Sequence, residues 1–202
     1  MANGAFNQQT RQAAVAGMFY PSDSGVLSAE ISRCISAANL RLPYEEVDSG
    51  LVGVIAPHAG YIYSGEVAAC LYRLLPTSQK KVAVIGPSHR VSFSGVSAPS
   101  CALYSTPLGD VPVDQEGIAS LVEAGAVDVS DAPHALEHSV EVQVPFLQYL
   151  LPEFTLIPLV VGDATVDEVA AILSRLRTMG YFLVISSDLS HFLSYDEACV
   201  VD

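Results

Sequence analysis

Short apolar runs rich in Val, Ile and Leu alternate along the chain with segments whose apolar residues recur at helical spacing. Runs of the first kind are typical of parallel strands that are buried on both faces. We expect four such strands, at residues 51–56, 82–86, 154–161 and 181–187. The segments with helical spacing are residues 24–38, 64–75, 114–124, 139–151 and 163–179. This alternation predicts a single α/β domain over residues 1–202, with a mostly parallel central sheet flanked by helices.

Capping residues refine the helix boundaries. Asp114 stands where a helix N-cap is expected, and Thr165 with Glu168 has the spacing of a capping box. Pro145 should either kink the helix over residues 139–151 or make that helix begin later, because proline lacks the amide proton a helix interior needs.

The remaining segments are less regular. Residues 51–86 should form a βαβ unit with a right-handed crossover, and residues 91–113 should give one or two edge strands with turns. Residues 1–12 are polar, and we expect them to be loosely held. We predict a loop over residues 40–49. Apolar residues are still arriving in a helical stretch at residues 195–202, so we expect a C-terminal part of the domain to be absent.

The charge balance narrows the partners. The chain of 202 residues has 22 acidic and 9 basic side chains, a formal net charge of −13. Nucleic acid and anionic membrane surfaces both require a basic patch, so we expect neither as a partner. No apolar run approaches the roughly 18 residues of a spanning helix. The four cysteines have no CxxC spacing, and the N-terminus lacks the pattern of a secretory signal, which predicts a reduced cytoplasmic setting.

The histidines are placed unevenly. His58, His89 and His191 each follow one of the predicted strands by a few residues. Ligands of open α/β sheets bind outside the carboxyl ends of the strands, so three such exits would bring imidazoles from distant positions to one edge. His134 and His138 fall together in one short segment. This distribution predicts a metal or acid/base site.

Other polar residues near these exits are candidates for the same site. Asp188 could ligate a metal, orient an imidazole, or serve only as a helix N-cap. His191 could ligate or transfer protons, since its ordinary pKa near 6.5 suits both roles. Glu137 precedes a predicted helix, where the helix dipole favours a carboxylate whatever its role. Tyr61 and Tyr63 either line the pocket or are ordinary packing residues.

Paired imidazoles suit several transition metals. Zn, Fe, Cu and Ni all accept imidazole ligands, and two histidines with one carboxylate and open positions are typical of ferrous oxygenases. The spacing itself is not a specific metal motif. The prediction depends on the shared position at strand exits.

Five segments together resemble the Memo family, which includes the AmmeMemoRadiSam system B proteins. They are residues 15–21 (VAGMFYP), 56–65 (APHAGYIYSG), 86–89 (GPSH), 137–147 (EHSVEVQVPFL) and 186–192 (SSDLSHF). The resemblance runs in order from about residue 13 to the end of the chain. It implies a fold shared with the class III, LigB-type extradiol dioxygenases, which are non-haem iron enzymes.

The resemblance also implies roles for individual residues. His58 and His89 fall on the two metal-ligand histidines of those dioxygenases, His191 near their acid/base histidine, and His138 near a pocket histidine. Memo proteins are described as iron- or copper-binding redox proteins whose site is completed by a cysteine nearer the C-terminus. This sequence departs there, since Cys199 follows His191 too closely for that role and the dioxygenases' late glutamate ligand is missing.

We therefore expect a mononuclear metal site with redox or dioxygenase-like chemistry. Its ligands would be His58, His89 and His191, with Fe(II) as the expected ion and Cu or Zn as alternatives. His191, His138 and Asp188 would transfer protons or orient groups, and the pocket would take a small molecule or a peptide. The alternative is a non-catalytic binding or scaffold protein with a vestigial dioxygenase pocket. Zinc-assisted hydrolysis ranks last, and a homodimer is compatible with the edge-like segments.

Overall fold

The computed structural model describes residues 9–41 and 50–202, and their main feature is a six-stranded sheet in the order β2-β9-β3-β8-β4-β7. All neighbouring strands run parallel except β4 and β8. The strands are β2 (Gly53–Ala56), β9 (Phe182–Ser186), β3 (Lys81–Pro87), β8 (Thr155–Val161), β4 (Val96–Ala98) and β7 (Asp128–Val129). The prediction of an α/β fold with a mostly parallel sheet is confirmed.

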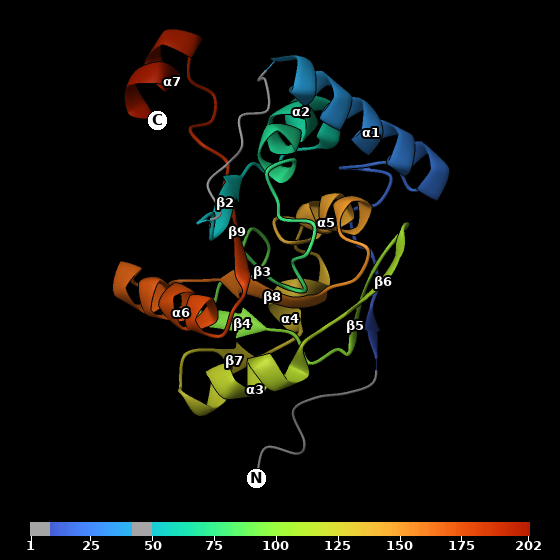
Figure 1. Cartoon of the computed structure of the whole chain (residues 1–202). Helices are drawn as coiled ribbons and strands as arrows, with labels where there is room; N and C mark the ends of the chain where they lie inside the picture. Colours follow the sequence, from blue (N-terminus) through green and yellow to red (C-terminus); the bar gives the residue numbers. More distant parts are fainter. Residues whose placement is uncertain (1–8, 42–49) are drawn as a thin grey trace.

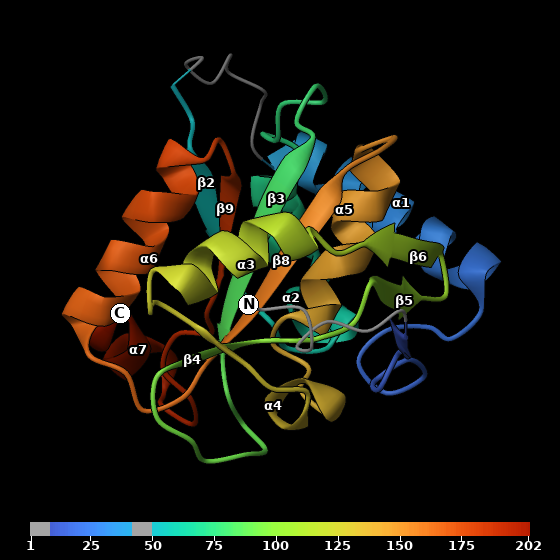
Figure 2. The same cartoon turned by 90° about the horizontal axis from the view of Figure 1, so that it is seen from below.

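Helices cover both faces of this sheet (Figures 1 and 2). On one face lie α1 (Ser24–Arg41), α2 (Tyr61–Tyr72) and α5 (Val144–Leu150), and on the other lie α3 (Gln115–Glu123) and α6 (Val166–Thr178). The central strands β3, β8 and β9 are therefore almost wholly buried, as their uninterrupted apolar runs require. Among the described residues, no helix is both long and apolar enough to cross a lipid bilayer.

The strand order corrects one expectation. The βαβ reasoning places the strands before His58 and His89 side by side, but β9 lies between them and pairs with both. β9 is buried on both faces, so it belongs in the interior of the sheet. β2 has one partner, and its Ile55 is 64% exposed, as an edge strand allows.

Most local predictions hold. Asp114 caps α3, and Thr165 with Glu168 forms a capping box at α6. Of the two outcomes at Pro145, the later start is the one found. A 3-10 turn, η1 (Glu141–Gln143), precedes α5, and Pro145 stands in the first turn of that helix.

The structure differs from the sequence predictions mainly in the irregular segments. Residues 91–113 supply β4 and also β5 (Leu103–Thr106) and β6 (Gly109–Pro112), which form a second sheet with β1 (Thr10–Arg11). The expectation of a loosely held stretch is therefore wrong for residues 10–11, while residues 1–8 lie outside the described part. The predicted loop over residues 40–49 is overlapped by α1 through Arg41, and residues 42–49 are also outside the described part.

Two short helices complete the architecture. α4 (Ala132–Ala135) precedes the segment that carries Glu137 and His138, and sequence patterns did not predict it. α7 (Tyr195–Val201) has a capping box but no buried residue, and it stands apart from the helical layers in Figure 1.

Candidate metal centre

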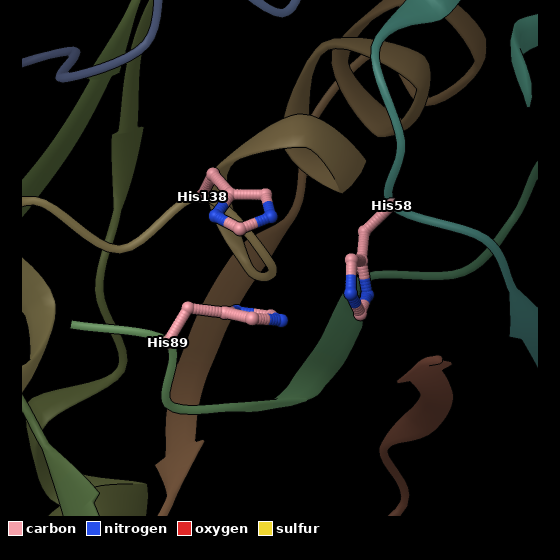
Figure 3. Close-up of side chains that lie close together, drawn as sticks. All are labelled: His58, His89 and His138. Carbon is pink, nitrogen blue, oxygen red and sulfur yellow. The ribbon is translucent and has the colours of Figure 1, made fainter. Parts of the chain in front are cut away.

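Three imidazoles from distant parts of the chain face one another at the carboxyl edge of the sheet (Figure 3). His58 follows β2, His89 follows β3, and His138 lies between α4 and η1. Their ring centroids are 5.1 Å (His58 to His89), 5.4 Å (His58 to His138) and 4.4 Å (His89 to His138) apart. One nitrogen from each ring lies within 4.8 Å of the other two. Three of the five histidines, His58, His89 and His138, therefore converge.

Ser186, at the end of β9, fixes the orientation of His58. The Ser186 hydroxyl donates its only proton to the carbonyl of Ser139, and it accepts a hydrogen bond from the side-chain amide of Gln143. The contact of 3.0 Å between this hydroxyl and His58 Nδ1 must then be donated by the imidazole. His58 Nε2 is consequently left with a free lone pair.

Glu137 does the equivalent for His89. Its Oε1 lies 2.9 Å from His89 Nδ1, and a carboxylate is an acceptor only, so Nδ1 carries the proton. His89 Nε2 is therefore also unprotonated while the ring is neutral. A carboxylate behind an imidazole in this way is the usual support of a metal-ligating histidine.

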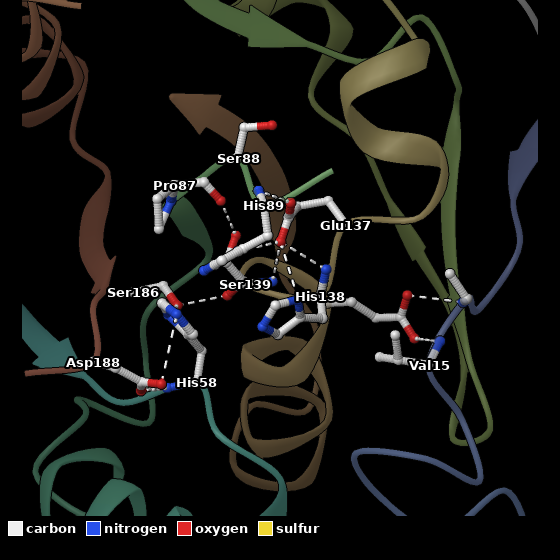
Figure 4. Close-up of polar contacts among 12 residues, drawn as sticks. Val15, His58, Pro87, Ser88, His89, Glu137, His138, Ser139, Ser186 and Asp188 are labelled. Atoms are coloured by element: carbon white, nitrogen blue, oxygen red, sulfur yellow. Dashed lines mark hydrogen bonds and ion pairs between the residues drawn. The ribbon is translucent and has the colours of Figure 1, made fainter. Parts of the chain in front are cut away.

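The Glu137 carboxylate also organises the loop around it (Figure 4). It accepts hydrogen bonds from the backbone amides of His89, His138 and Ser139 at 2.6, 2.9 and 2.9 Å, and its side chain is 1% exposed. Burial alone would raise the pKa of Glu137, but the donated hydrogen bonds outweigh it and lower that pKa below its ordinary value. Glu137 is thus held as a buried anion.

His138 is held neutral. Burial, followed by the positive charge that His89 can carry, lowers the pKa of His138 to about 4. Its ring packs on Phe19 at 4.4 Å between centroids. His138 Nδ1 is buried without a hydrogen bond, although Glu137 Oε1 is 3.2 Å away, because the two atoms are poorly aligned. Burial likewise lowers the pKa of His58, so two of the three rings are poor bases and good ligands at neutral pH.

A buried ion pair braces the loop that bears Glu137 and His138. Arg11 pairs with the fully buried Glu141, and its guanidinium also donates to the carbonyls of His134 and Glu137 at 2.8 and 2.9 Å. Glu141 in turn accepts from the backbone amides of Ala14 and Val15. The N-terminal segment therefore ties down the 134–141 loop.

Close approach at the end of β3 completes the support. A Cβ on Gly86 would lie 2.6 Å from the hydroxyl of Ser139, so only glycine lets the loop rest on the strand here. That hydroxyl donates to the carbonyl of Pro87 at 2.8 Å. Neither this contact nor Arg11, Glu141 or Ser186 was among the sequence candidates.

The other candidates lie around the group rather than in it. The Asp188 carboxylate accepts from the His58 amide at 2.6 Å, and its Oδ2 lies 3.7 Å from His58 Nε2 and 3.4 Å from His191 Nε2. No described helix begins at Asp188, so the helix-cap alternative is wrong. The His191 side chain is 58% exposed and is not part of the three-imidazole group.

The remaining three candidates are not members of the three-imidazole group. Tyr61 is buried in the core, where its hydroxyl donates to the carbonyl of Val142, and Tyr63 is 80% exposed on α2. His134 is buried in α4, where Nε2 lies 3.0 Å from the carbonyl of Ser97. None of these three belongs to the group of imidazoles found among the described residues.

The arrangement fits a metal ion. The hydrogen bonds of His58 and His89 place the proton of each ring on Nδ1, which leaves both Nε2 lone pairs available for a metal. The third ring, His138, is neutral and has a buried nitrogen without a hydrogen bond. Without an ion, three converging imidazoles would leave acceptor lone pairs facing one another. The fold and this site define a class: α/β proteins with three histidines that could hold a metal ion at the carboxyl edge of a mostly parallel sheet.

Comparison with known proteins specifies the family. The family described as "Memo-like protein" matches residues 11–200, so the chain belongs to the Memo-like family. A MEMO1 family protein of Methanococcoides burtonii is 37% identical over 195 residues, which cover 93% of this chain and 70% of the relative. A MEMO1 family protein of Methanobrevibacter smithii is 39% identical over 206 residues, covering 95% of this chain and 73% of the relative. The family resemblance predicted from the five motifs is confirmed.

Proposed function

We propose that this protein binds a single transition-metal ion and uses it in redox or dioxygen chemistry. The ligands would be His58 and His89, with His138 as the third imidazole. The observation that carries the proposal is the convergence of one nitrogen from each ring within 4.8 Å, with His58 held by Ser186 and His89 held by the buried Glu137. His191, the third ligand expected from the sequence, has a more exposed ring and faces Asp188 instead.

The donor set limits the metal. Neutral imidazoles suit Fe, Cu, Zn and Ni, and exclude ions that need an oxygen cage, such as Ca²⁺. Among these, membership of the Memo-like family favours iron or copper, with Fe(II) as our first choice. A bound ion would supply Lewis-acid or one-electron chemistry at the open side of the site.

Asp188 and His191 would transfer protons. Asp188 lies between the buried His58 and the exposed His191, with one carboxylate oxygen within 3.7 Å of both Nε2 atoms. The His191 side chain is 58% exposed, so its ring is in contact with solvent. The pair would therefore pass protons between solvent and a ligand beside His58.

Metal titration of the full chain tests the proposal. Anaerobic addition of Fe(II) should give one bound ion per chain, measured by equilibrium dialysis and elemental analysis. The double variant His58→Ala, His89→Ala should lose at least about 100-fold in affinity, because two of the ligands are removed. His134→Gln is the matched histidine control, since glutamine can still donate to the carbonyl of Ser97, and it should bind iron like the parent.

Two results would contradict the proposal. Unchanged iron affinity in the double variant would remove the three imidazoles as the site. Tight iron binding with no oxygen consumption in the presence of catechols or thiols would support metal binding but contradict redox or dioxygen chemistry. That result would favour the scaffold alternative.

A further inference from the structure

An open cavity of about 470 Å³ adjoins the three-imidazole group on the His89 side. Its wall is built from the loop after β3 and from the end of β8, residues 87–93 and 161–163. Because His89 itself lines the cavity, a ligand there would be next to the proposed metal. The lining mixes Ser88 and Ser92 with the ring of Phe93, which suits a small molecule with both polar and apolar parts.

Arg90 is the cation of this cavity. It follows His89 directly, its side chain is exposed, and within the described ranges its guanidinium has neither a hydrogen bond nor an ion pair. Arg11 and Arg33, in contrast, are paired with glutamates. Arg175 and Arg177 are exposed in the last turn of α6, where the helix dipole favours positive charge. Arg90 has no such local reason for its position.

Arg90 and the imidazole of His89 line the same cavity. Asp163 is the acidic residue in the lining, so the cavity has one residue of each charge in its wall. In a chain with a net charge of −13, an unpaired guanidinium beside a histidine cluster gives this cavity a local positive charge that can attract an anionic ligand.

We propose that Arg90 binds the carboxylate of a small acidic ligand whose other end reaches the metal held by His58, His89 and His138. The inference rests on the proposed function and specifies its substrate class. The planar guanidinium matches a carboxylate in two parallel hydrogen bonds, which a lysine cannot reproduce. Arg90 is then a specificity residue, and the three imidazoles bind metal without it.

Two probes that differ in one carboxylate test this inference. The full chain is loaded with Co(II), whose visible absorption reports its coordination, and is titrated with acetohydroxamate and with succinic acid monohydroxamate. Both probes attach to the metal through the hydroxamate, but only the second carries a distal carboxylate. The parent should bind the carboxylate probe about five- to tenfold more tightly, the value of one partly exposed charge-assisted contact.

Variants of Arg90 isolate the cause. Arg90→Gln should abolish the preference and leave acetohydroxamate affinity and Co(II) affinity unchanged, whereas Arg90→Lys should keep part of it. Arg175→Gln, a surface arginine on α6, should behave like the parent. Equal binding of the two probes by the Co(II)-loaded parent would overturn the inference alone, as would a preference that survives in Arg90→Gln. Failure of the parent to bind Co(II) would overturn both this inference and the proposed function.

Discussion

The two halves of the carboxyl edge of the sheet, where the three imidazoles lie, differ in how their side chains are held. On the half that carries His89 and His138, the carboxylates of Glu137 and Glu141 are buried, and each accepts several hydrogen bonds from backbone amides. On the other half, the side chain of Asp188 is 16% exposed and His191 is 58% exposed. The comparison separates two tasks. The buried carboxylate of Glu137 fixes the direction of the His89 ring, and that of Glu141 pairs with Arg11, which holds the loop. Exposed groups, in contrast, can exchange protons with water.

Removal of Glu141 tests the buried half most severely. Glu141→Gln would leave the Arg11 guanidinium buried without its counter-charge, and we expect a loss of about 3 to 5 kcal/mol in the free energy of unfolding. Urea denaturation followed by circular dichroism measures it. Arg33→Ala, which breaks an exposed pair with Glu30 and Glu66, should change the midpoint little. A loss below about 1 kcal/mol for Glu141→Gln would mean that the buried half is not braced as described.

Acid should weaken the buried half through His134. Burial lowers the pKa of His134 to about 4 in the folded protein, against about 6.5 when unfolded. Between these values the unfolded chain binds the proton and the folded chain does not, so the stabilising contribution is complete above about pH 6.5 and is lost as pH falls towards 4. We expect this residue to account for about 2 kcal/mol of the difference in unfolding free energy between pH 7 and pH 4.5.

His134→Gln is the variant for this measurement, because glutamine does not titrate. Its pH dependence of stability should be shallower than that of the parent. Some slope should remain, since the pKa of His138 is also lowered to about 4. Identical slopes in the two proteins would show that His134 is not the responsible group.

The smallest effects compare the two halves directly. Glu137→Gln removes the charge behind His89 Nδ1, and we expect metal affinity to fall about 10- to 100-fold. His191→Gln should change that affinity by less than about twofold, because its ring lies outside the three-imidazole group. Both are measured by competition with a chromophoric chelator. If His191→Gln weakens metal binding as much as Glu137→Gln does, His191 is a ligand, as the sequence alone suggested.

Much of the architecture could be predicted because it depends on local patterns. The apolar runs that end at Ala56 and Ser186 are strands, and the capping residues of α3 and α6 do what their spacing indicates. The convergence of His58 and His89 followed from a general property of parallel sheets. Strand order did not follow, since β2, β3 and β9 carry similar apolar runs and nothing local says which one is central.

The supports of the site were missed for a different reason. Arg11 and Glu141 are 130 residues apart, and Ser186 is separated from His58 by 128 residues, so no spacing rule connects them. One signal was available. Glu141 and Gln143 interrupt a run of valines that is otherwise apolar, and polar groups inside such a run need buried partners.

The position of β9 has a consequence for how the protein is made. The two strands that lead to His58 and His89 leave the ribosome early, yet the strand that joins them is supplied about 95 residues after β3 (Phe182 against Pro87). Until β9 is synthesised, β2 and β3 lack the strand that pairs with both of them. The hydroxyl of Ser186, which accepts the hydrogen bond from His58 Nδ1, is also missing. The candidate metal site is therefore completed by a late, long-range step of folding rather than by the appearance of the histidines themselves.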